Sequence, residues 1–310
     1  MPIAVVGSLG LDTIETPAGR VEEVLGGSAA YFALAARHFV PVSVVAVVGS
    51  DFPAEARRAL EHPELDLTGV EVQEGKTFRW EGVYSRDMNT RETRRTELNV
   101  FERFRPTLHT ALRSATNVFL ANIDPVLQRE VLDQLERPKL VLLDTMNYWI
   151  HGKRAELLEI MKRIRILLIN EEEARELTGE ALTHKAARAI LSLGPEAVII
   201  KQGEHGAILQ SRRELYFTCP AVPIESVVDP TGAGDTFAGG FFGALARMGR
   251  VTDRTLRAAV VYGTVLASFT VEDFGVSGLL RVQRPEILRR ADAIMEMTHF
   301  SLDNTARLVR

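Results

Sequence analysis

Cysteine is almost absent from this chain of 310 residues, because Cys219 is the only one. A single cysteine excludes an intramolecular disulfide framework. The first twelve residues place no basic region ahead of their apolar run, so we expect no secretory leader, and both observations favour a reducing, cytoplasmic setting. Apolar runs such as Val42 to Val48 are far shorter than the roughly 18 residues of a membrane-spanning helix. We therefore expect no membrane association.

An excess of charge of one sign is also lacking. The 37 Lys and Arg residues face 41 Asp and Glu residues, for a net charge of -4, so no global field favours nucleic acid or an anionic membrane as a partner. The chain contains no HExxH, CxxC or GxSxG motif, and its seven histidines are scattered. The sequence therefore lacks the motifs of zinc hydrolases, dithiol redox proteins and α/β-hydrolases.

The composition that remains, 46% hydrophobic and 25% charged, is that of an ordinary globular protein. A short β-branched run opens the chain, residues 28–39 have apolar residues at helical spacing, and residues 42–49 form a second apolar run. Strand, helix and strand in this order predict a parallel pair. The alternation returns after residue 117 and ends in long helices. We therefore predict an α/β fold with an open, mostly parallel sheet and helices on both faces.

Two segments, 13–25 and 71–100, interrupt this alternation of strands and helices. From Phe78 to Tyr84, large and small apolar residues alternate with polar ones at period two, which indicates strands with one covered face. Since both segments are insertions between core elements, we expect them to pair as a small antiparallel β lid over the edge where α/β proteins bind ligands. The predicted division is a main domain of residues 1–12, 26–70 and 101–310 and a lid of residues 13–25 and 71–100.

The most informative segment is DPTGAGDTF, residues 229–237, between a strand-like and a helix-like segment. Gly232 and Gly234 allow the backbone to approach a ligand closely, and the N–H groups that open the following helix form an anion hole. Asp235 would repel a phosphate that was merely bound there. It fits a general base that takes a proton from an attacking hydroxyl during phosphoryl transfer. The alternative interpretation is that Asp229 or Asp235 only caps a helix.

Residues 229–241, DPTGAGDTFAGGF, resemble the C-terminal signature of the ribokinase-like (PfkB-type) carbohydrate and nucleoside kinase family. Further similarities are GSLGLD at residues 7–12, GGSAA at 26–30, NEEE at 170–173 and KQGEHG at 201–206, all in the family's order. The resemblance covers almost the whole chain. It implies a ribokinase-like fold and an ATP-dependent kinase that uses Mg²⁺ and possesses, as an optional feature, a K⁺ site.

The resemblance also implies a role for each matching residue. Asp235 would be the general base, with Gly232, Ala233 and Gly234 as the anion hole. The sugar or nucleoside substrate would be bound by Asp12, Gly26, Gly27 and Ser28, and the nucleotide by Asn170, Lys201, Gly203 and Gly206. Glu173 would hold Mg²⁺ indirectly, and Asp229 with Thr231 would hold a monovalent cation.

Each element outside the DPTGAGD segment has a purely structural alternative. Asp12 could be a turn aspartate, and the pair Gly26 and Gly27 could serve a tight strand-to-helix turn. Residues 170–173 suit a helix N-cap with an acidic first turn. The glycines of residues 203–206 would suit a β-hairpin equally well.

Departures from the family pattern bear on the substrate. Tyr31 stands where many members have an asparagine that contacts a sugar hydroxyl, and residues 144–149, DTMNYW, lack the arginine that meets a substrate phosphate. If the substrate were a phosphosugar, the arginines of the lid would have to bind its phosphate. We expect transfer to a primary hydroxyl of a small sugar. A nucleoside kinase of the adenosine, inosine or cytidine type is the alternative, because Tyr31 and the lid aromatics could stack on a base. A third interpretation is a non-catalytic protein that binds a sugar or a nucleotide. The expected state is a monomer or a homodimer through the lid.

Overall fold

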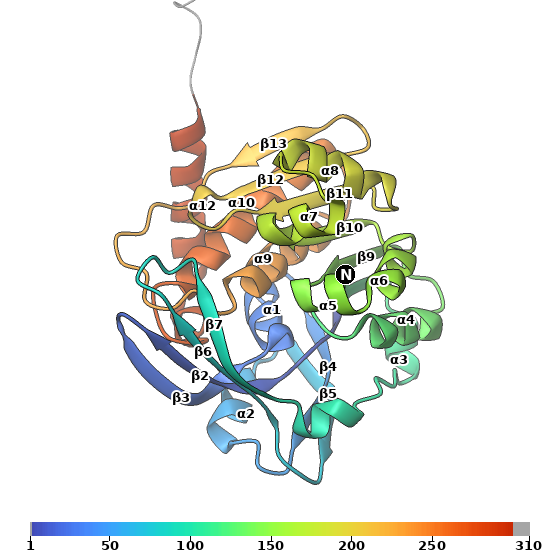
Figure 1. Ribbon diagram of the computed structural model, residues 1–310, viewed down its shortest axis with the longest axis vertical. Coiled ribbons are helices and arrows are strands. Elements are labelled where there is room, and N and C mark those ends of the chain that lie inside the picture. Colours follow the sequence, from blue (N-terminus) through green and yellow to red (C-terminus); the bar gives the residue numbers. More distant parts are fainter. Residues whose placement is uncertain (1, 300–310) are drawn as a thin grey trace, which may run out of the picture.

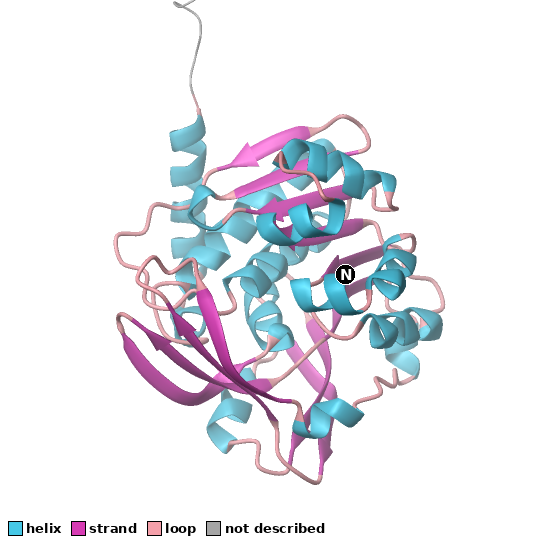
Figure 2. Cartoon of the chain, in the orientation of Figure 1, coloured by secondary structure: helices cyan, strands magenta, loops and turns pink. Residues whose placement is uncertain are grey.

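The computed structural model describes residues 2–299, and within them the main sheet has nine strands in the order β13-β12-β11-β10-β9-β8-β1-β4-β5 (Figures 1 and 2). All neighbours pair in parallel except β12, which is antiparallel to both β11 and β13. The strands are β1 (Ile3–Val6), β4 (Val42–Gly49), β5 (Leu65–Gln73), β8 (Asn117–Leu120), β9 (Leu140–Asp144), β10 (Ile166–Asn170), β11 (Ala197–Lys201), β12 (Ala207–Ser211) and β13 (Tyr216–Cys219).

Helices cover both faces of this sheet, because its strands are apolar on both sides. Along β1, Ile3 and Val5 join one hydrophobic cluster while Ala4 and Val6 join the other. The first cluster is covered by α1 (Ser28–Ala36), α2 (Ala54–Leu60), α9 (Ala233–Met248), α10 (Asp253–Thr270), α11 (Ser277–Arg281) and α12 (Arg284–Thr298). The second is covered by α3 (Thr110–Arg113), α4 (Pro125–Gln134), α5 (Asn147–Gly152), α6 (Arg154–Met161), α7 (Glu171–Thr178) and α8 (Thr183–Ser192).

A second sheet of four strands, in the order β3-β2-β6-β7, lies beside the main one (Figure 1). Its strands are β2 (Gly10–Thr16), β3 (Gly19–Gly26), β6 (Phe78–Tyr84) and β7 (Arg91–Glu97), and a 3₁₀ turn, η1 (Asn99–Arg103), leads back to the main sheet. The outer pairs are antiparallel, but β2 and β6 run parallel. Each of these two strands follows a parallel strand of the main sheet, β1 or β5, so both leave it in the same direction. The predicted fold class is confirmed, with this parallel pair as an added detail.

Two hydrogen bonds fasten the small sheet to the segment before α9. The Thr16 hydroxyl of β2 donates to the Val228 carbonyl at 2.8 Å, and the Thr231 hydroxyl donates to the Tyr84 hydroxyl of β6 at 3.1 Å. The small sheet is therefore held directly against the residues that lead into α9.

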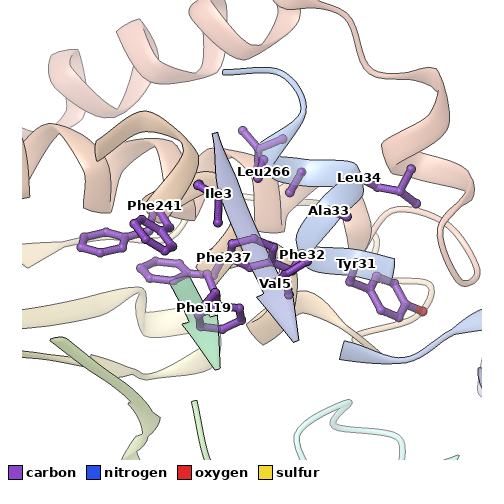
Figure 3. Packing of buried hydrophobic residues seen from close by; sticks show 14 of the residues in the cluster. Ile3, Val5, Tyr31, Phe32, Ala33, Leu34, Phe119, Phe237, Phe241 and Leu266 are labelled. Carbon is purple, nitrogen blue, oxygen red and sulfur yellow. The ribbon is translucent and has the colours of Figure 1, made fainter. Parts of the chain in front are cut away.

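Close packing of α9 against α1 sets the position of the helix that carries Asp235. The ring of Phe32 in α1 stacks on Phe119 of β8 at 4.2 Å between centroids, and Phe237 and Phe241 of α9 extend the same cluster (Figure 3). A Cβ at Gly239 would lie 2.3 Å from the Phe32 carbonyl oxygen, so only glycine permits this approach. Among the helices described, none is long and apolar enough to cross a lipid bilayer.

Candidate active site

The candidate site forms where strands of the main sheet end under the small sheet. Asp144, Asn170 and Lys201 are the last residues of β9, β10 and β11, and parallel strands place their carboxyl ends at one edge. Asp12 enters from β2 and Asp235 from the first turn of α9. The structure thus brings together side chains that are more than two hundred positions apart in the sequence.

The N-terminus of α9 is built to receive an anion. Its N-cap is Gly232, which has φ 73° and no side chain to accept from the first-turn N–H groups. A Cβ at Gly232 would lie 2.4 Å from the ring of Tyr31, so the turn requires glycine for its conformation and for space. Uncapped N–H groups at the positive end of a sixteen-residue helix fit a phosphate. The capping alternative for Asp235 is not what the structure shows, because no side chain caps α9.

Asp235 is a carboxyl group whose pKa lies near neutrality. Burial and the neighbouring Asp144 raise its pKa to about 7, against the opposing charges of Lys201 and Arg91. A carboxyl group with a pKa near neutrality exchanges protons effectively at that pH, since its ionised fraction and its proton affinity are both substantial.

Asp12 is buried at the start of the small sheet, with 4% of its surface exposed. Burial, followed by the charges of Asp229 and Asp235, raises its pKa to about 8, although Arg91 acts in the other direction. Its carboxylate accepts no hydrogen bond from any residue that the structure describes. A buried acceptor of this kind is suited to a ligand hydroxyl.

Gly26, Gly27 and Ser28 determine the backbone path around Asp12. A Cβ at Gly26 would lie 2.0 Å from the Asp12 carboxylate, and one at Gly27, which has φ 96°, would lie 2.5 Å from the Ser8 carbonyl oxygen. The hydroxyls of Ser8 and Ser28 pair at 3.2 Å, and the N–H of each residue donates to the hydroxyl of the other. The tight-turn interpretation of Gly26 and Gly27 therefore applies, while Gly26 also makes room for Asp12.

Asn170 and Glu173 form a capping box at the start of α7. The Glu173 N–H donates to the Asn170 side-chain oxygen at 2.8 Å, and Glu173 Oε2 accepts from the Asn170 N–H at 3.0 Å. The helix N-cap interpretation is therefore confirmed. Burial, opposed by Lys201 and assisted by Asp144, raises the pKa of Glu173 to about 7. Its second oxygen accepts no hydrogen bond within the described chain, so it remains able to orient a ligand at the site.

Lys201 lies next to the first turn of α9. Its ammonium donates to Asp144 Oδ2 at 2.8 Å, and a Cβ at Gly234 would lie 3.1 Å from Nζ. Burial lowers the pKa of Lys201, but the negative charges of Asp144, Glu173 and Asp235 outweigh it and the pKa is raised. No role for Asp144 follows from the pattern of residues 144–149, although an aspartate that ends a buried strand, as Asn170 and Lys201 end theirs, could have indicated one.

The remaining predicted residues lie in turns around this centre. Gly203, with φ 56°, and Gly206, with φ 92°, enclose a 3₁₀ turn, η2 (Gly203–His205), that joins the antiparallel strands β11 and β12. This turn is the β-hairpin that the sequence left as an alternative. Asp229 is fully buried, and its two oxygens accept from the N–H groups of Thr231 and Gly275 at 2.8 and 2.9 Å. No cluster of three or more acidic, His or Cys residues suited to a metal occurs in residues 2–299.

Tyr31 fills the space between α1, α9 and the small sheet. Only 1% of it is exposed, and its hydroxyl has no hydrogen-bond partner among the described residues. Burial and the charges of Asp12 and Asp229 raise its pKa well above the usual value. Tyr84 is also buried, at 8% exposed. Neither ring offers a free face to a nucleobase, so both act as interior packing.

Most of the chain resembles known kinases. A family model described as pfkB family carbohydrate kinase matches residues 3–281. A cytidine kinase from Thermococcus kodakarensis is 33% identical over 263 residues, which cover 83% of this chain and 92% of that protein.

Solved structures show the same fold. A nucleoside kinase from Methanocaldococcus jannaschii, described as an archaeal member of the ribokinase family, superposes with a TM-score of 0.76 at 21% identity, over 94% of this chain and 98% of that one. A putative ribokinase II from E. coli, in complex with ATP and Mg²⁺, superposes with a TM-score of 0.76 at 18% identity, over 96% of this chain and 99% of that one.

Proposed function

The chain belongs to the pfkB family of carbohydrate kinases and is an ATP-dependent kinase of the carbohydrate and nucleoside type. We propose that it phosphorylates the primary hydroxyl of a nucleoside. The support for a nucleoside is the 33% identity to a cytidine kinase over most of both chains. A small sugar, which the sequence analysis put first, is the second candidate, because the matching family model describes carbohydrate kinases.

The observation that carries the proposed phosphoryl transfer is the position of Asp235 in the first turn of α9, which no side chain caps. Asp235 takes the proton of the acceptor hydroxyl as the oxygen forms its bond to the γ-phosphorus of ATP. The bond from that phosphorus to the bridging oxygen breaks, and ADP leaves. The N–H groups of Gly232, Gly234 and Asp235 stabilise the negative charge on the transferring group, and Lys201 adds a positive charge beside Gly234. The Ala233 N–H, which the family resemblance also implies for the anion hole, donates instead to the Pro230 carbonyl at 3.2 Å.

Acceptor binding is assigned to Asp12. Its carboxylate is buried, has no hydrogen-bond partner in residues 2–299 and interacts electrostatically with Asp235. Hydroxyl groups of the acceptor sugar would satisfy it and would direct the primary hydroxyl toward Asp235. Gly26 contributes by leaving room for the carboxylate.

The proposal includes two cations, Mg²⁺ and a monovalent cation, which rest on different observations. Mg²⁺ would neutralise charge on the ATP phosphates, and Glu173 with Asn170 fits an indirect role because one buried Glu173 oxygen has no partner within the described chain. A monovalent cation near Asp229 and Thr231 rests on the family resemblance alone. Asp229 already accepts two N–H bonds, so backbone carbonyls would have to supply most of that coordination.

The proposal is tested by ADP release from ATP and Mg²⁺ with cytidine, adenosine, inosine, ribose, fructose and 2-keto-3-deoxygluconate as acceptors. We expect turnover with a nucleoside. Asp235→Asn should reduce kcat by about 10²-fold or more, the range of general-base contributions, and leave ATP affinity nearly unchanged. Asp133→Asn is the matched control, because Asp133 forms a surface ion pair with Arg163.

Each outcome has a distinct meaning. Turnover only with a free sugar would replace the nucleoside by the second candidate. Near-full turnover in Asp235→Asn would remove Asp235 from the role of base. Binding of ATP with no turnover on any acceptor would favour the non-catalytic interpretation.

A further inference from the structure

Helix α1 leads from the candidate active site to a separate hollow. The helix begins at Ser28, next to the glycine pair that makes room for Asp12, and its C-cap is Arg37, about 13 Å further along the helix axis at 1.5 Å per residue. The hollow at this far end has a volume of about 600 Å³. Four basic side chains line it: Arg37, His38, Arg58 and His62. These basic groups are gathered well away from the first turn of α9.

Arg37 differs from the other half-buried arginines because it has no carboxylate partner. Four arginines are half-buried in residues 2–299, and three of them, Arg79, Arg165 and Arg290, each form an ion pair with an Asp or Glu. Arg37 forms none at 4.0 Å or less within that range. Burial lowers its pKa, and no negative charge opposes this effect. A half-buried charge of this kind would be stabilised by an anion in the hollow.

The guanidinium of Arg37 also has unused hydrogen-bond donors. Its Nη2 donates to the Leu279 carbonyl of α11 at 3.4 Å, which is a long hydrogen bond. Its Nε is buried without a partner among the described residues, and its Nη1 forms no hydrogen bond with them either. The neighbouring His38 likewise has a buried Nε2 that meets no partner in this part of the chain. Since buried polar atoms are normally paired, this end of α1 has the capacity to bind a polar ligand.

His62 supplies a further donor to the same hollow. Its Nδ1 accepts a hydrogen bond from the Glu64 N–H at 3.1 Å, so the neutral ring carries its proton on Nε2. Nε2 forms no hydrogen bond with any residue that the structure describes. Burial and the charge of Arg37 lower the pKa of His62, whereas Glu64 raises it. The Nε2–H group is therefore free to donate to a ligand.

The electrostatic field inside the hollow is positive. Two acidic residues, Glu55 and Glu61, also line it, but both are exposed and neither forms an ion pair within residues 2–299. Burial lowers the pKa of His38 to about 4, and the charges that assist burial are those of Arg37 and His62, both positive. The two carboxylates therefore leave the basic groups uncompensated.

One wall of the hollow is apolar. Leu280 of α11 is 40% exposed, and Ala59 and Val282 also line the hollow. A phosphate ion alone would occupy a small part of about 600 Å³. The volume and the apolar wall thus fit a phosphate that is attached to an organic group.

We propose that this hollow is a second binding site, distinct from the candidate active site, and that it takes a small organic phosphate. Arg37 and His62 donate hydrogen bonds to the phosphate oxygens, Arg58 adds a positive charge, and Leu280 contacts the organic part. A phosphate group suits this set of donors, because it has three acceptor oxygens and up to two negative charges. Free inorganic phosphate has the same chemistry and is the second source of the anion.

The experiment observes the hollow directly by NMR of the histidine Cε1–H groups in ¹³C-labelled protein. The signals of His38 and His62 are identified with His38→Gln and His62→Gln. Phenyl phosphate and inorganic phosphate are the probes, and phenol is the uncharged control. The non-hydrolysable ATP analogue AMP-PNP and Mg²⁺ are present throughout, so that the probes do not compete for the nucleotide site.

We expect phenyl phosphate to shift both signals in a saturable way that gives a Kd. Arg37→Met should raise this Kd about tenfold or more, as expected for the loss of a charge-assisted hydrogen bond. Arg58→Met, at an exposed position, should raise it by a smaller factor and keeps the test valid if Arg37→Met does not fold. Arg57→Met is the matched control, because Arg57 is exposed on the same helix, α2, and does not line the hollow.

The three probes separate the outcomes. Equal or tighter binding of inorganic phosphate would retain the site with the free anion as its ligand. The proposal would be overturned by the absence of a saturable shift with either phosphate, or by phenol causing the same shifts as phenyl phosphate. An unchanged Kd in both Arg37→Met and Arg58→Met would overturn it as well. None of these outcomes depends on which acceptor the enzyme phosphorylates.

Discussion

Asp12, Glu173 and Asp235 occupy an environment that raises the pKa of carboxyl groups to near neutral pH. The pKa of Asp12 is raised to about 8 and those of Glu173 and Asp235 to about 7, in each case chiefly by burial. Lys201 and Arg91 counteract burial at Asp235. The pKa of Asp235, the proposed base, therefore reflects burial and Asp144, which raise it, and two cations, one from the main sheet and one from the small sheet, which lower it.

The raised pKa of Asp235 predicts an acid limb in the activity. Only the ionised carboxylate accepts the proton of the substrate hydroxyl, and the ionised fraction falls as the pH drops through the pKa of about 7. We expect kcat/KM for the acceptor to decrease by about tenfold per pH unit below pH 7. Initial rates between pH 5 and 9 measure this. Constant kcat/KM down to pH 5 would show that Asp235 is not the titrating base.

Sequence alone identified many candidate residues at this scale but not how they interact. DPTGAGD marked Asp235 because its glycines allow the backbone to approach an anion, and a carboxylate there would repel a phosphate that was merely bound. The contact of Arg91 with Trp80 was not identifiable, since charged residues occupy most positions of RETRRTE in β7. Its place depends on the register of β6 and β7, which sets Arg91 opposite Tyr84.

At the scale of elements, the position of α9 relative to α1 determines where its first turn points. Gly239 allows the helices to touch, because a Cβ there would meet the Phe32 carbonyl oxygen at 2.3 Å. The sequence predicted α9 and α10 from their apolar spacing. It left the β11–β12 hairpin undecided, because Gly203 and Gly206 suit a ligand-binding turn and a hairpin turn equally well. It also did not anticipate the parallel pairing of β2 with β6.

Gly239→Ala is therefore expected to damage both stability and catalysis. Overpacking at this backbone contact should lower the free energy of unfolding by about 1–3 kcal/mol. Displacement of the first turn of α9 should lower kcat as well. Urea unfolding and steady-state kinetics measure the two effects. Gly152→Ala is the control, because nothing lies within 4 Å of a Cβ at that position in α5, and equal behaviour of the two variants would contradict the argument.

At the scale of the whole molecule, the outer edges of the small sheet determine whether two copies can pair. The outer strand β7 reads RETRRTE, and a charged edge strand disfavours pairing with a second edge. Of the two states that the sequence allows, we therefore expect the monomer. Light scattering after size exclusion in about 0.15 M salt should give a mass near 34.4 kDa. A mass of about twice that value would show that the charged edges are covered in a dimer.

The hydrogen bonds that fasten the small sheet also bear on how the protein is made. Thr16 is bonded to Val228, 212 positions later, and Tyr84 to Thr231, 147 positions later. During translation, Asp12, Tyr31 and the small sheet leave the ribosome long before the segment that holds them. A nascent chain that ends before residue 228 therefore contains every strand of both sheets but lacks α9 and the residues that fasten the small sheet. Kinase function is acquired only when the last quarter of the polypeptide has been synthesised.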